Sequence, residues 1–331
     1  MNIKSTLPVL SKLLVKWYKE NSRTLPWRIN RDPYRIWISE VMLQQTTVTA
    51  VIPFYERFME RFPNLRDLAS ATIEEVYGHW AGLGYYSRAR NLHRAAQELA
   101  KINFPQTANE LIQYPGFGPY TSRAVASLAF SEPVGVLDGN VIRVLTRVHG
   151  LQIAWWKPEE KNKLQKLSDQ LAQLQDPYLM NQALMELGAT VCTPKKPACL
   201  ICPWMKHCVS FENQSQMTIP RQKPRKKSEI WVWKPQVIRK GSQICLAENH
   251  YVPFLKKTLL FPGQAEISKK KPKKFDLRHT ITHHNIYIQI DSKVKLKGSI
   301  KGAKWVEISE IKTHNPSILL QKVLHHCFKN K

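Results

Sequence analysis

The amino-acid sequence has no apolar run long enough to cross a membrane as a helix, so no membrane partner is expected. Its first residues, MNIKSTLPVLSKLLVKWYKEN, place Lys among apolar residues at helical spacing and lack the uninterrupted core of a signal peptide. We therefore expect an intracellular protein. Because thiols stay reduced inside cells, the six cysteines do not predict a disulfide framework.

Acidic residues are scarce: 25 Asp and Glu stand against 50 Lys and Arg, which gives a formal net charge of +25. The basic excess is uneven, since residues 1–220 hold 25 basic and 18 acidic side chains, while residues 221–331 hold 25 and 7. A chain of this charge is expected to bind an acidic polymer, and composition alone suits RNA as well as DNA.

Internal repeats are also absent, and the length of 331 residues predicts two domains. Residues 1–210 carry helical periodicity and predict an all-α domain, including one helix from Asp32 to about Ile52, where Pro53 should end it. Residues 211–228 are polar, basic and contain proline, which is typical of a linker.

Residues 229–331 predict a small α+β domain. The segment IWVWKPQVIR should pair with QICLAEN across a turn at residues 241–242. Alternation over residues 286–290 predicts a half-buried strand, and residues 316–328 predict a helix. Five lysines between residues 269 and 274 predict an exposed loop.

The sequence YPGFGPYTSRA predicts a tight turn between two helices. Gly116 and Gly118 permit positive φ angles and a close approach of the backbone to a ligand. The amides at the start of the next helix favour an anion. An ordinary connection between helices is an equally good interpretation of this turn when it is taken alone.

Two carboxylates stand out near this turn. Asp138 precedes an apolar helix and suits an N-cap, where backbone amides and the helix dipole favour its ionised form. Glu40 lies inside the apolar run RIWISEVMLQQT, where desolvation would raise its pKa and keep a proton available for general acid catalysis. A simple helix cap and a solvated surface Glu are the alternatives.

Four cysteines follow the helical region with the spacing C-x6-C-x2-C-x5-C: Cys192, Cys199, Cys202 and Cys208. Such a cluster in an intracellular chain indicates metal ligation. Chemistry alone leaves Zn²⁺ and an iron–sulfur cluster both open, since each accepts four thiolates.

The stretch GLGYYSRAR combines glycines, tyrosines and arginines. It predicts a loop that contacts a nucleic-acid duplex, or else a helix connection whose tyrosines pack inward.

Taken together, the segments LPWR, PYRIWISEVMLQQT, GLGYYSRARNLH, YPGFGPYTSRA, VLDGNVIRV, NQALMELGA and the four cysteines resemble the MutY-type adenine DNA glycosylases of the endonuclease III-like helix-hairpin-helix superfamily. The resemblance covers residues 1–210. It implies one [4Fe-4S] cluster held by the four cysteines. It also implies a substrate of double-stranded DNA with adenine opposite 8-oxoguanine or guanine. We expect a monomer in the cytoplasm, associated with the nucleoid if the chain is bacterial.

The resemblance also implies roles for single residues. Glu40 would protonate adenine, Asp138 would stabilise the oxocarbenium-like sugar, and Tyr120 and Asn140 would support them. Arg28 and Gln182 are expected near the extruded adenine. Gln45 and Tyr85 are expected to wedge into the duplex, and Gly116 and Gly118 to contact a backbone phosphate. Hydrolysis of an N-glycosidic bond needs such an acid and anion pair, and a mispaired base leaves the stack more easily than a paired one.

Bifunctional relatives carry a Lys just after the hairpin and cleave the strand through a Schiff base. This chain has Tyr120 there, and residues 102–156 contain no Lys. The resemblance therefore implies a monofunctional glycosylase that leaves an abasic site. A DNA-binding scaffold without catalysis is the alternative, and it would need neither Glu40 nor Asp138.

The C-terminal domain resembles the MutT-like, Nudix-fold domain by which the family recognises 8-oxoguanine, in a degenerate form. LLFPG at residues 259–263 lacks the Trp of the family segment, and the Phe-Ser-His contact loop becomes Ile281, Thr282 and His283. Only 17 residues separate Gly263 from Ile281, and they contain no Glu-rich helix, so Nudix hydrolysis is not expected. A basic DNA clamp is the alternative role for this domain.

Overall fold

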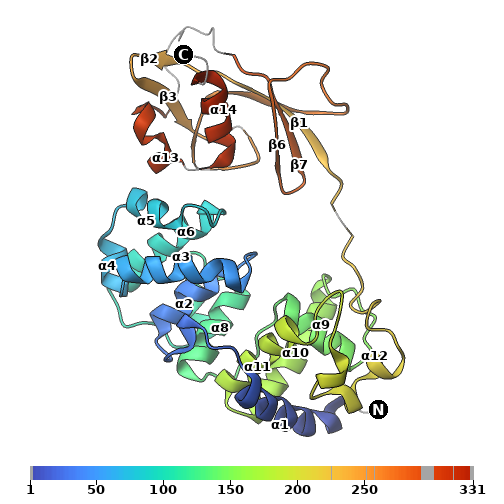
Figure 1. The fold of residues 1–331 in the computed structure, drawn as a ribbon. Coiled ribbons are helices and arrows are strands. Elements are labelled where there is room, and N and C mark those ends of the chain that lie inside the picture. The colour runs from blue at the N-terminus through green and yellow to red at the C-terminus, as the bar shows by residue number, and fades with distance from the viewer. Residues whose placement is uncertain are drawn as a thin grey trace. The chain divides into compact units, whose positions relative to one another are not determined.

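A computed structural model describes residues 3–224, 226–250, 252–256, 258–291, 302–315 and 317–328. These residues form two compact units (Figure 1). The N-terminal unit holds the residues up to Ala71 together with Tyr85–Pro224, and the C-terminal unit holds Thr72–Gly84 with the residues from 226 onward. None of the helices described is long and apolar enough to span a membrane.

Helices account for nearly all regular structure before residue 213. They are α1 (Ile3–Asn21), η1 (Pro26–Arg28), α2 (Pro33–Met42), α3 (Val48–Arg61), α4 (Leu65–Ser70), α5 (Ile73–Trp80), α6 (Tyr86–Leu99), α7 (Ala108–Leu111), α8 (Pro119–Phe130), α9 (Gly139–Val148), α10 (Pro158–Leu174), α11 (Pro177–Thr190), η2 (Cys199–Ile201), η3 (Met205–His207) and α12 (Val209–Glu212).

The core of the N-terminal unit forms where α2 packs on α8 and where α11 packs on α1, α8 and α9. Residues 112–118 form the hairpin turn between α7 and α8. Trp37 of α2 is fully buried and stacks on Phe117 of this turn, with ring centroids 5.0 Å apart and an interplanar angle of 18°. Removing such large aromatic surfaces from water supplies much of the stability of a core. The same stacking fixes the hairpin turn against the helix that carries Glu40.

The prediction of one helix from Asp32 to about Ile52 is wrong. Residues 43–47 separate α2 from α3, and Gln45 takes a positive φ of 57°, which an α-helix cannot contain. Pro53 does not end a helix either, because it lies inside α3. A proline inside a helix removes a single hydrogen bond, and the buried residues Val51 and Tyr55 fasten α3 on either side of Pro53.

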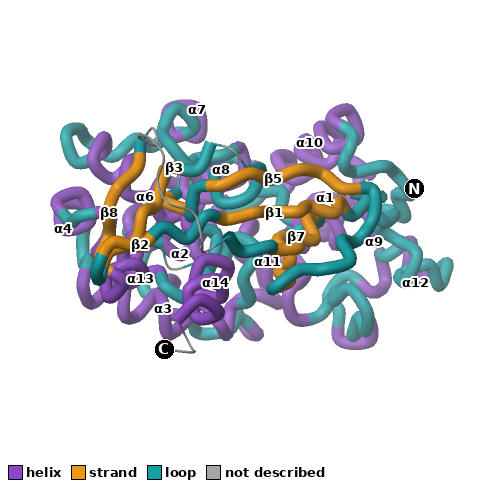
Figure 2. Tube along the Cα trace, turned by 90° about the horizontal axis from the view of Figure 1, so that it is seen from above, coloured by secondary structure: helices purple, strands orange, loops and turns teal. Residues whose placement is uncertain are grey.

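Every strand described lies between residues 229 and 307 (Figure 2). The strands are β1 (Glu229–Pro235), β2 (Arg239–Lys240), β3 (Gln243–Glu248), β4 (Leu259–Leu260), β5 (Gly263–Ser268), β6 (Leu277–Ile281), β7 (His284–Ile288) and β8 (Ala303–Glu307). One sheet has the order β5-β1-β7-β6, and the other has β2-β3-β4 with β8 also paired to β3. The helical elements η4 (Ile308–Glu310), α13 (Ile311–His314) and α14 (Ile318–Phe328) follow.

The predicted pairing of IWVWKPQVIR with QICLAEN is only partly right. The turn at residues 241–242 joins β2 to β3, but β1 lies in the other sheet, antiparallel to β5 and parallel to β7. Two neighbours cover both edges of β1, so it cannot pair with β3. The strand predicted over residues 286–290 ends at Ile288, and Ile286, Tyr287 and Ile288 are all buried rather than alternating. Ile286 and Ile288 lie in the core, while Tyr287 points to the opposite face and packs against Phe275.

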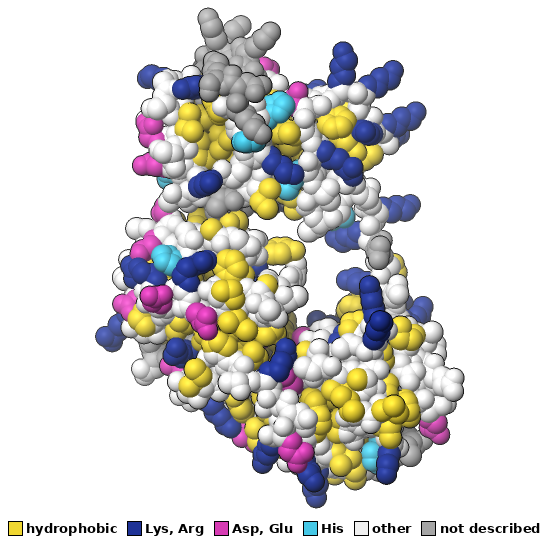
Figure 3. Space-filling view, viewed as in Figure 1, with side chains coloured by type: hydrophobic (Ala, Val, Ile, Leu, Met, Phe, Trp, Pro, Cys, Tyr) yellow, Lys and Arg dark blue, Asp and Glu magenta, His cyan; other side chains and the backbone are white. Residues whose placement is uncertain are grey.

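Apolar residues of both sheets and of α14 share one core in the C-terminal unit, where Trp233 and Phe261 are fully buried. The helix predicted over residues 316–328 is present as α14 from Ile318; residue 316 lies outside the described residues. The lysines at positions 269–271, 273 and 274 are exposed, which confirms the predicted loop. Figure 3 shows Lys and Arg side chains projecting from the surface of this unit.

The segment predicted as a linker, residues 211–228, begins as packed structure. Ile219 has 2% of its surface exposed, and its carbonyl accepts a hydrogen bond of 2.8 Å from Nε of Arg147 on α9. The first part of this segment therefore packs against the N-terminal unit, which extends to Pro224.

Candidate active site

A cavity of about 660 Å³ opens in the N-terminal unit between α2, the hairpin turn, the start of α9 and α11. Nine residues singled out in the sequence line it: Arg28, Glu40, Gln45, Gly116, Gly118, Tyr120, Asp138, Asn140 and Gln182. Tyr85 lies outside its lining, and Thr282 and His283 belong to the C-terminal unit. The fold thus gathers side chains from segments up to 154 positions apart (28 to 182) around one space.

Glu40 is the buried carboxyl of this cavity, with 5% of its surface exposed. The O–H of Tyr120, on the first turn of α8, donates to Oε2 of Glu40 at 2.7 Å. Burial raises the pKa of Glu40 to about 7; the hydrogen bond from Tyr120 opposes this rise, and the charge of Asp138 adds to it. A carboxyl with that pKa is partly protonated at neutral pH, as a general acid requires.

Asp138 is the N-cap of α9. Its Oδ1 accepts the backbone N–H of Val141 at 2.7 Å, and its Oδ2 accepts the side-chain amide of Asn140 at 3.0 Å. Burial raises the pKa of Asp138, and these N–H donors oppose the rise. The expectation that the helix N-terminus alone would favour the anion is therefore incomplete. The two carboxyls differ instead in their partners: N–H donors surround Asp138, while Glu40 accepts one O–H.

Arg143 fixes the side chain of Asn140. Its Nη2 donates to Oδ1 of Asn140 and to the carbonyl of Gly188, each at 2.7 Å. Its Nε donates to the carbonyl of Cys192 at 2.7 Å. The guanidinium therefore joins Asn140, α11 and the first cysteine through a planar fork with little freedom to move.

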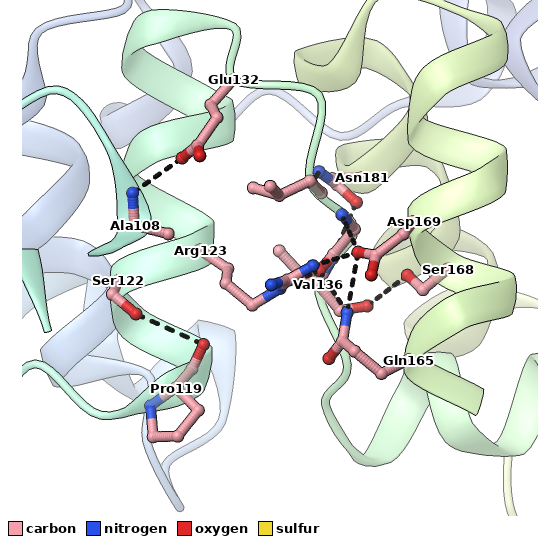
Figure 4. A network of polar contacts seen from close by, with 12 residues as sticks. Ala108, Pro119, Ser122, Arg123, Glu132, Val136, Gln165, Ser168, Asp169 and Asn181 are labelled. Carbon is pink, nitrogen blue, oxygen red and sulfur yellow. Dashed lines mark hydrogen bonds and ion pairs between the residues drawn. The ribbon is translucent and has the colours of Figure 1, made fainter. Parts of the chain in front are cut away.

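The loop before Asp138 is fixed by a polar network (Figure 4). Oδ1 of Asn181 accepts the N–H of Val136 at 3.0 Å, and the hydroxyl of Ser168 donates to the carbonyl of Val136 at 2.6 Å. Arg123 of α8 forms an ion pair with Asp169 of α10 and also donates to the carbonyl of residue 135 at 2.8 Å. Helices α8, α10 and α11 thus hold the loop from three sides, which sets the position of Asp138.

Glu186 is a cavity residue that sequence reasoning missed. It is fully buried, and its two carboxylate oxygens accept Nε of Arg23 at 2.6 Å and Nη2 of Arg28 at 2.8 Å. Burial alone would raise the pKa of Glu186, but the hydrogen bonds and charges of the two arginines lower it. Nε of Arg28 finds no hydrogen-bond acceptor among the described residues. The signal was present in NQALMELGA, because a Glu inside an apolar helix is the feature that singled out Glu40.

Gln45 and Tyr85 lie on two exposed turns of the N-terminal unit. Both have positive φ angles, 57° and 50°, and Tyr85 has 48% of its surface exposed. Nη1 of Arg88 donates to the carbonyls of Val41, Met42 and Gln44 at 2.6–3.1 Å, and its guanidinium lies 5.1 Å from the centre of the Tyr85 ring. Arg88 therefore contacts both turns and stabilises their positive φ angles, which are unfavourable for residues other than glycine.

The hairpin turn has the open backbone that the sequence predicted. Gly116 has a φ of 85°, which a side chain would strain, and Gly118 is the N-cap of α8 with no atom within 4 Å of its missing Cβ. Both residues are exposed. A ligand can therefore approach the backbone closely at Gly118.

The four cysteines surround a small space together with Arg147, Met205 and Phe211. Nη1 of Arg147 lies 3.5 Å from Sγ of Cys192, where it can donate to an anionic ligand. Four thiols around one space, with a guanidinium beside the first of them, are a donor set that an iron–sulfur cluster accepts.

Comparison with known proteins places these features in a family. Residues 38–171 match the HhH-GPD superfamily of base excision DNA repair proteins, and residues 192–208 match the iron–sulfur binding domain of endonuclease III. The adenine DNA glycosylase of Buchnera aphidicola subsp. Schizaphis graminum is 31% identical over 304 residues, which is 86% of this chain and 87% of that relative. The chain belongs to the adenine DNA glycosylase family. The family match and the iron–sulfur segment confirm the resemblance found in the sequence.

Other relatives are more similar in sequence, but over a smaller part of both chains. The adenine DNA glycosylase of Rattus norvegicus is 45% identical over 215 residues, and the chain spans only 42% of it. A solved thermostable thymine-DNA glycosylase is 27% identical with a TM-score of 0.58, covering 63% of this chain and 98% of that one. A non-covalent endonuclease III–DNA complex, at 22% identity and a TM-score of 0.55, covers 65% of this chain and 99% of that one and supports the fold alone. A mainly helical glycosylase fold followed by an α+β unit is thus confirmed.

Proposed function

We propose that the protein hydrolyses the N-glycosidic bond of adenine opposite 8-oxoguanine or guanine in duplex DNA and leaves an abasic site. The observation that carries this proposal is the pair of carboxyls in one cavity: Glu40 with a pKa of about 7, and Asp138 capping α9. Glycoside hydrolysis commonly divides its work between an acid and an anion in this way.

In the proposed reaction Glu40 transfers its proton to N7 of the extruded adenine. The C1′–N9 bond then breaks and its electron pair leaves with the base, so positive charge develops on the sugar. The carboxylate of Asp138 stabilises that charge, and the amide of Asn140 keeps the carboxylate in place. Water adds to C1′ and loses a proton. Tyr120 holds one oxygen of Glu40, which leaves the other oxygen to donate.

We assign base recognition to Arg28, Gln182 and Glu186, which line the same cavity. The carboxamide of Gln182 can hydrogen-bond the edge of a purine, and Arg28 lines the cavity beside it. We further propose that Gln45 and Tyr85 enter the duplex at the mispair, because both project from strained, exposed turns. The amides around Gly116 and Gly118 would bind a backbone phosphate.

We propose one [4Fe-4S] cluster on Cys192, Cys199, Cys202 and Cys208. Four thiolates are the usual ligands of such a cluster, which here would fasten the segment after α11. Lys195, Lys196 and Lys206 are exposed around it and would meet the DNA backbone.

The C-terminal unit is proposed to recognise the opposite base through Thr282 and His283. In this proposal the unit has a MutT-like fold, and the basic stretch after Pro224 connects it to the N-terminal unit. Full-length Thr282→Ala and His283→Ala variants test this: they should lose discrimination between 8-oxoguanine and guanine while still releasing adenine. Equal discrimination in wild type and variants would leave only the basic-clamp role.

The protein is proposed to be monofunctional and monomeric. Position 120 is Tyr, and the lysine that lines the cavity is Lys161 of α10. Borohydride should therefore trap no covalent adduct during the reaction. If an adduct forms and Lys161→Arg abolishes it, the chemistry includes a Schiff base and the monofunctional proposal fails.

The deciding experiment uses end-labelled duplexes carrying adenine opposite 8-oxoguanine, scored before and after hot alkali. Strand breaks on the adenine strand that appear only after alkali would support the proposal, and a duplex with adenine opposite thymine is the control. Glu40→Gln should abolish release while keeping DNA binding. Tight binding without base release by the wild type would favour a non-catalytic scaffold, and thymine release from a mismatch would assign a different substrate.

A further inference from the structure

Two histidines and a carboxylate converge at one end of the β5-β1-β7-β6 sheet, in the C-terminal unit. Glu229 opens β1, His284 opens β7, and His283 lies in the two-residue turn between β6 and β7. One ligand atom from each lies within 4.8 Å of the others. Among the described residues, no other set of three or more His, Cys, Asp or Glu side chains lies so close together.

The distances within this group suit coordination. Oε2 of Glu229 lies 3.0 Å from Nδ1 of His284, and Oε1 lies 3.8 Å from Nε2 of His283. Ligands bound tetrahedrally to Zn²⁺ at about 2.05 Å stand ~3.3 Å apart, between these two values. The three side chains therefore lie near the spacing that one bound ion requires.

The backbone and neighbouring side chains hold the three ligands in place. The parallel register pairs Glu229 with His284, and the backbone N–H of Glu229 donates to the carbonyl of His283 at 2.8 Å. Nε1 of Trp231 donates to Oε2 of Glu229 at 2.9 Å. Such outer contacts orient a ligating carboxylate before the metal arrives.

Thr282 offers a partner to the second ring nitrogen of His283. Oγ1 of Thr282 donates to the carbonyl of Ile281 at 2.7 Å and lies 3.3 Å from Nδ1 of His283, where its lone pair can accept an N–H. With the proton on Nδ1, the lone pair of Nε2 would be left for an ion. Ligating histidines usually donate their second ring nitrogen in this manner.

We propose that Glu229, His283 and His284 bind a borderline divalent cation, Zn²⁺ foremost, with solvent completing its coordination. Two imidazole nitrogens and one carboxylate oxygen match Zn²⁺ and its transition-metal neighbours, whereas Mg²⁺ and Ca²⁺ prefer oxygen ligands alone. The side chains of His283, His284 and Glu229 are 26%, 13% and 38% exposed, so the ion can enter from solvent.

A bound ion would fasten the β6–β7 turn to the start of β1. It would also engage the imidazole of His283, the side chain that we propose for recognition of the opposite base. The ion site does not depend on that role, because it is assembled within the C-terminal unit without DNA.

The test is calorimetric titration of the full-length protein with ZnCl₂, in the absence of DNA and with the iron–sulfur absorbance monitored throughout. We expect one equivalent of Zn²⁺ to bind with the cluster intact, and MgCl₂ to give no comparable binding. Glu229→Gln and His284→Asn should each weaken the binding about 10- to 100-fold or more. Glu229→Gln keeps an acceptor for Trp231, so loss of binding there would not reflect loss of that contact.

The matched control is His325→Asn with His326→Asn, which removes the other adjacent histidine pair of this unit, on α14. The control should keep the equivalent of Zn²⁺. Hydrogen exchange should locate the ion independently, as slower exchange of residues 281–285 when Zn²⁺ is added to wild type. Binding that is unchanged in the Glu229 and His284 variants, or that is lost in the control, would overturn the proposal, and so would uptake that tracks loss of the iron–sulfur absorbance.

Discussion

Glu40 should lower the free energy of unfolding at high pH, and Glu40→Gln should remove that loss of stability. In the folded state burial raises the pKa of Glu40 from 4.5 to about 7. The folded protein therefore holds the proton more tightly than the unfolded chain. The associated stability is fully present below pH 4.5, and it is lost as the pH rises through 7.

The size of the effect follows from that shift. A difference of about 2.5 pKa units at 1.36 kcal/mol per unit gives a cost of ~3 kcal/mol for the ionised, buried carboxylate. At about pH 5 only ~1 kcal/mol of this cost is present, because the unfolded chain has only begun to gain from releasing the proton that the folded state keeps. A Gln at position 40 has no proton to lose, keeps nearly the same shape and can accept the O–H of Tyr120.

Urea unfolding of both proteins at about pH 5 and about pH 8, followed by far-ultraviolet circular dichroism and cluster absorbance, measures the difference. Glu40→Gln should exceed wild type by ~1 kcal/mol at the lower pH and by ~3 kcal/mol at the higher pH. Glu98→Gln, at an exposed site on α6, is the control and should show no such pH dependence. An equal difference between Glu40→Gln and wild type at both pH values would refute the desolvated carboxyl, whatever the activity of the variant.

Three further predictions concern catalysis. Adenine release by the wild type should slow as the pH rises through about 7, because Glu40 loses the proton that it donates. Single-turnover rates that do not change with pH in this range would contradict the prediction. Tyr120→Phe removes a hydrogen bond that lowers the pKa of Glu40, so the falling limb of the pH–rate curve should move to higher pH while the maximal rate drops about 10-fold; an unmoved limb would argue against the contact. Gly188→Ala would place a Cβ atom 2.6 Å from Cβ of Asn140 and displace that amide, so the rate should fall about 10- to 100-fold, whereas Gly78→Ala, where nothing lies within 4 Å, should leave it unchanged.

Features fixed by neighbouring residues were predictable from the sequence. The hairpin turn follows from Pro and Gly chemistry, and α9 begins after Asp138 because a carboxylate there accepts the amide of Val141. The desolvation of Glu40 also followed from its apolar helix. Glu186 carried the same signal, but its two arginine partners are 158 and 163 positions away, and no local pattern names them.

The break between α2 and α3 shows where local pattern fails. Apolar residues recur on both sides of residues 43–47, at Val41, Met42 and Val48, and no Gly or Pro lies between them, so a single helix is the natural expectation from sequence. In the structure Arg88 of α6 donates to three carbonyls at the end of α2, which satisfies groups that a continued helix would otherwise use. A side chain more than 40 positions away thus stabilises the turn on which Gln45 projects, and that turn is needed if Gln45 is to enter a duplex.

The same limit explains why the cluster of Glu229, His283 and His284 was invisible in the sequence. A strand pattern specifies which face is buried but not which strand is the neighbour. The sequence favoured pairing β1 with the next strand along the chain, whereas the structure pairs it with β7 and sets Glu229 opposite His284, 55 positions away. A one-residue slip of that register would turn Glu229 to the other face of the sheet and separate the carboxylate from both imidazoles. The proposed ion site is therefore a consequence of strand register, and Zn²⁺ binding by the full-length protein also tests that register.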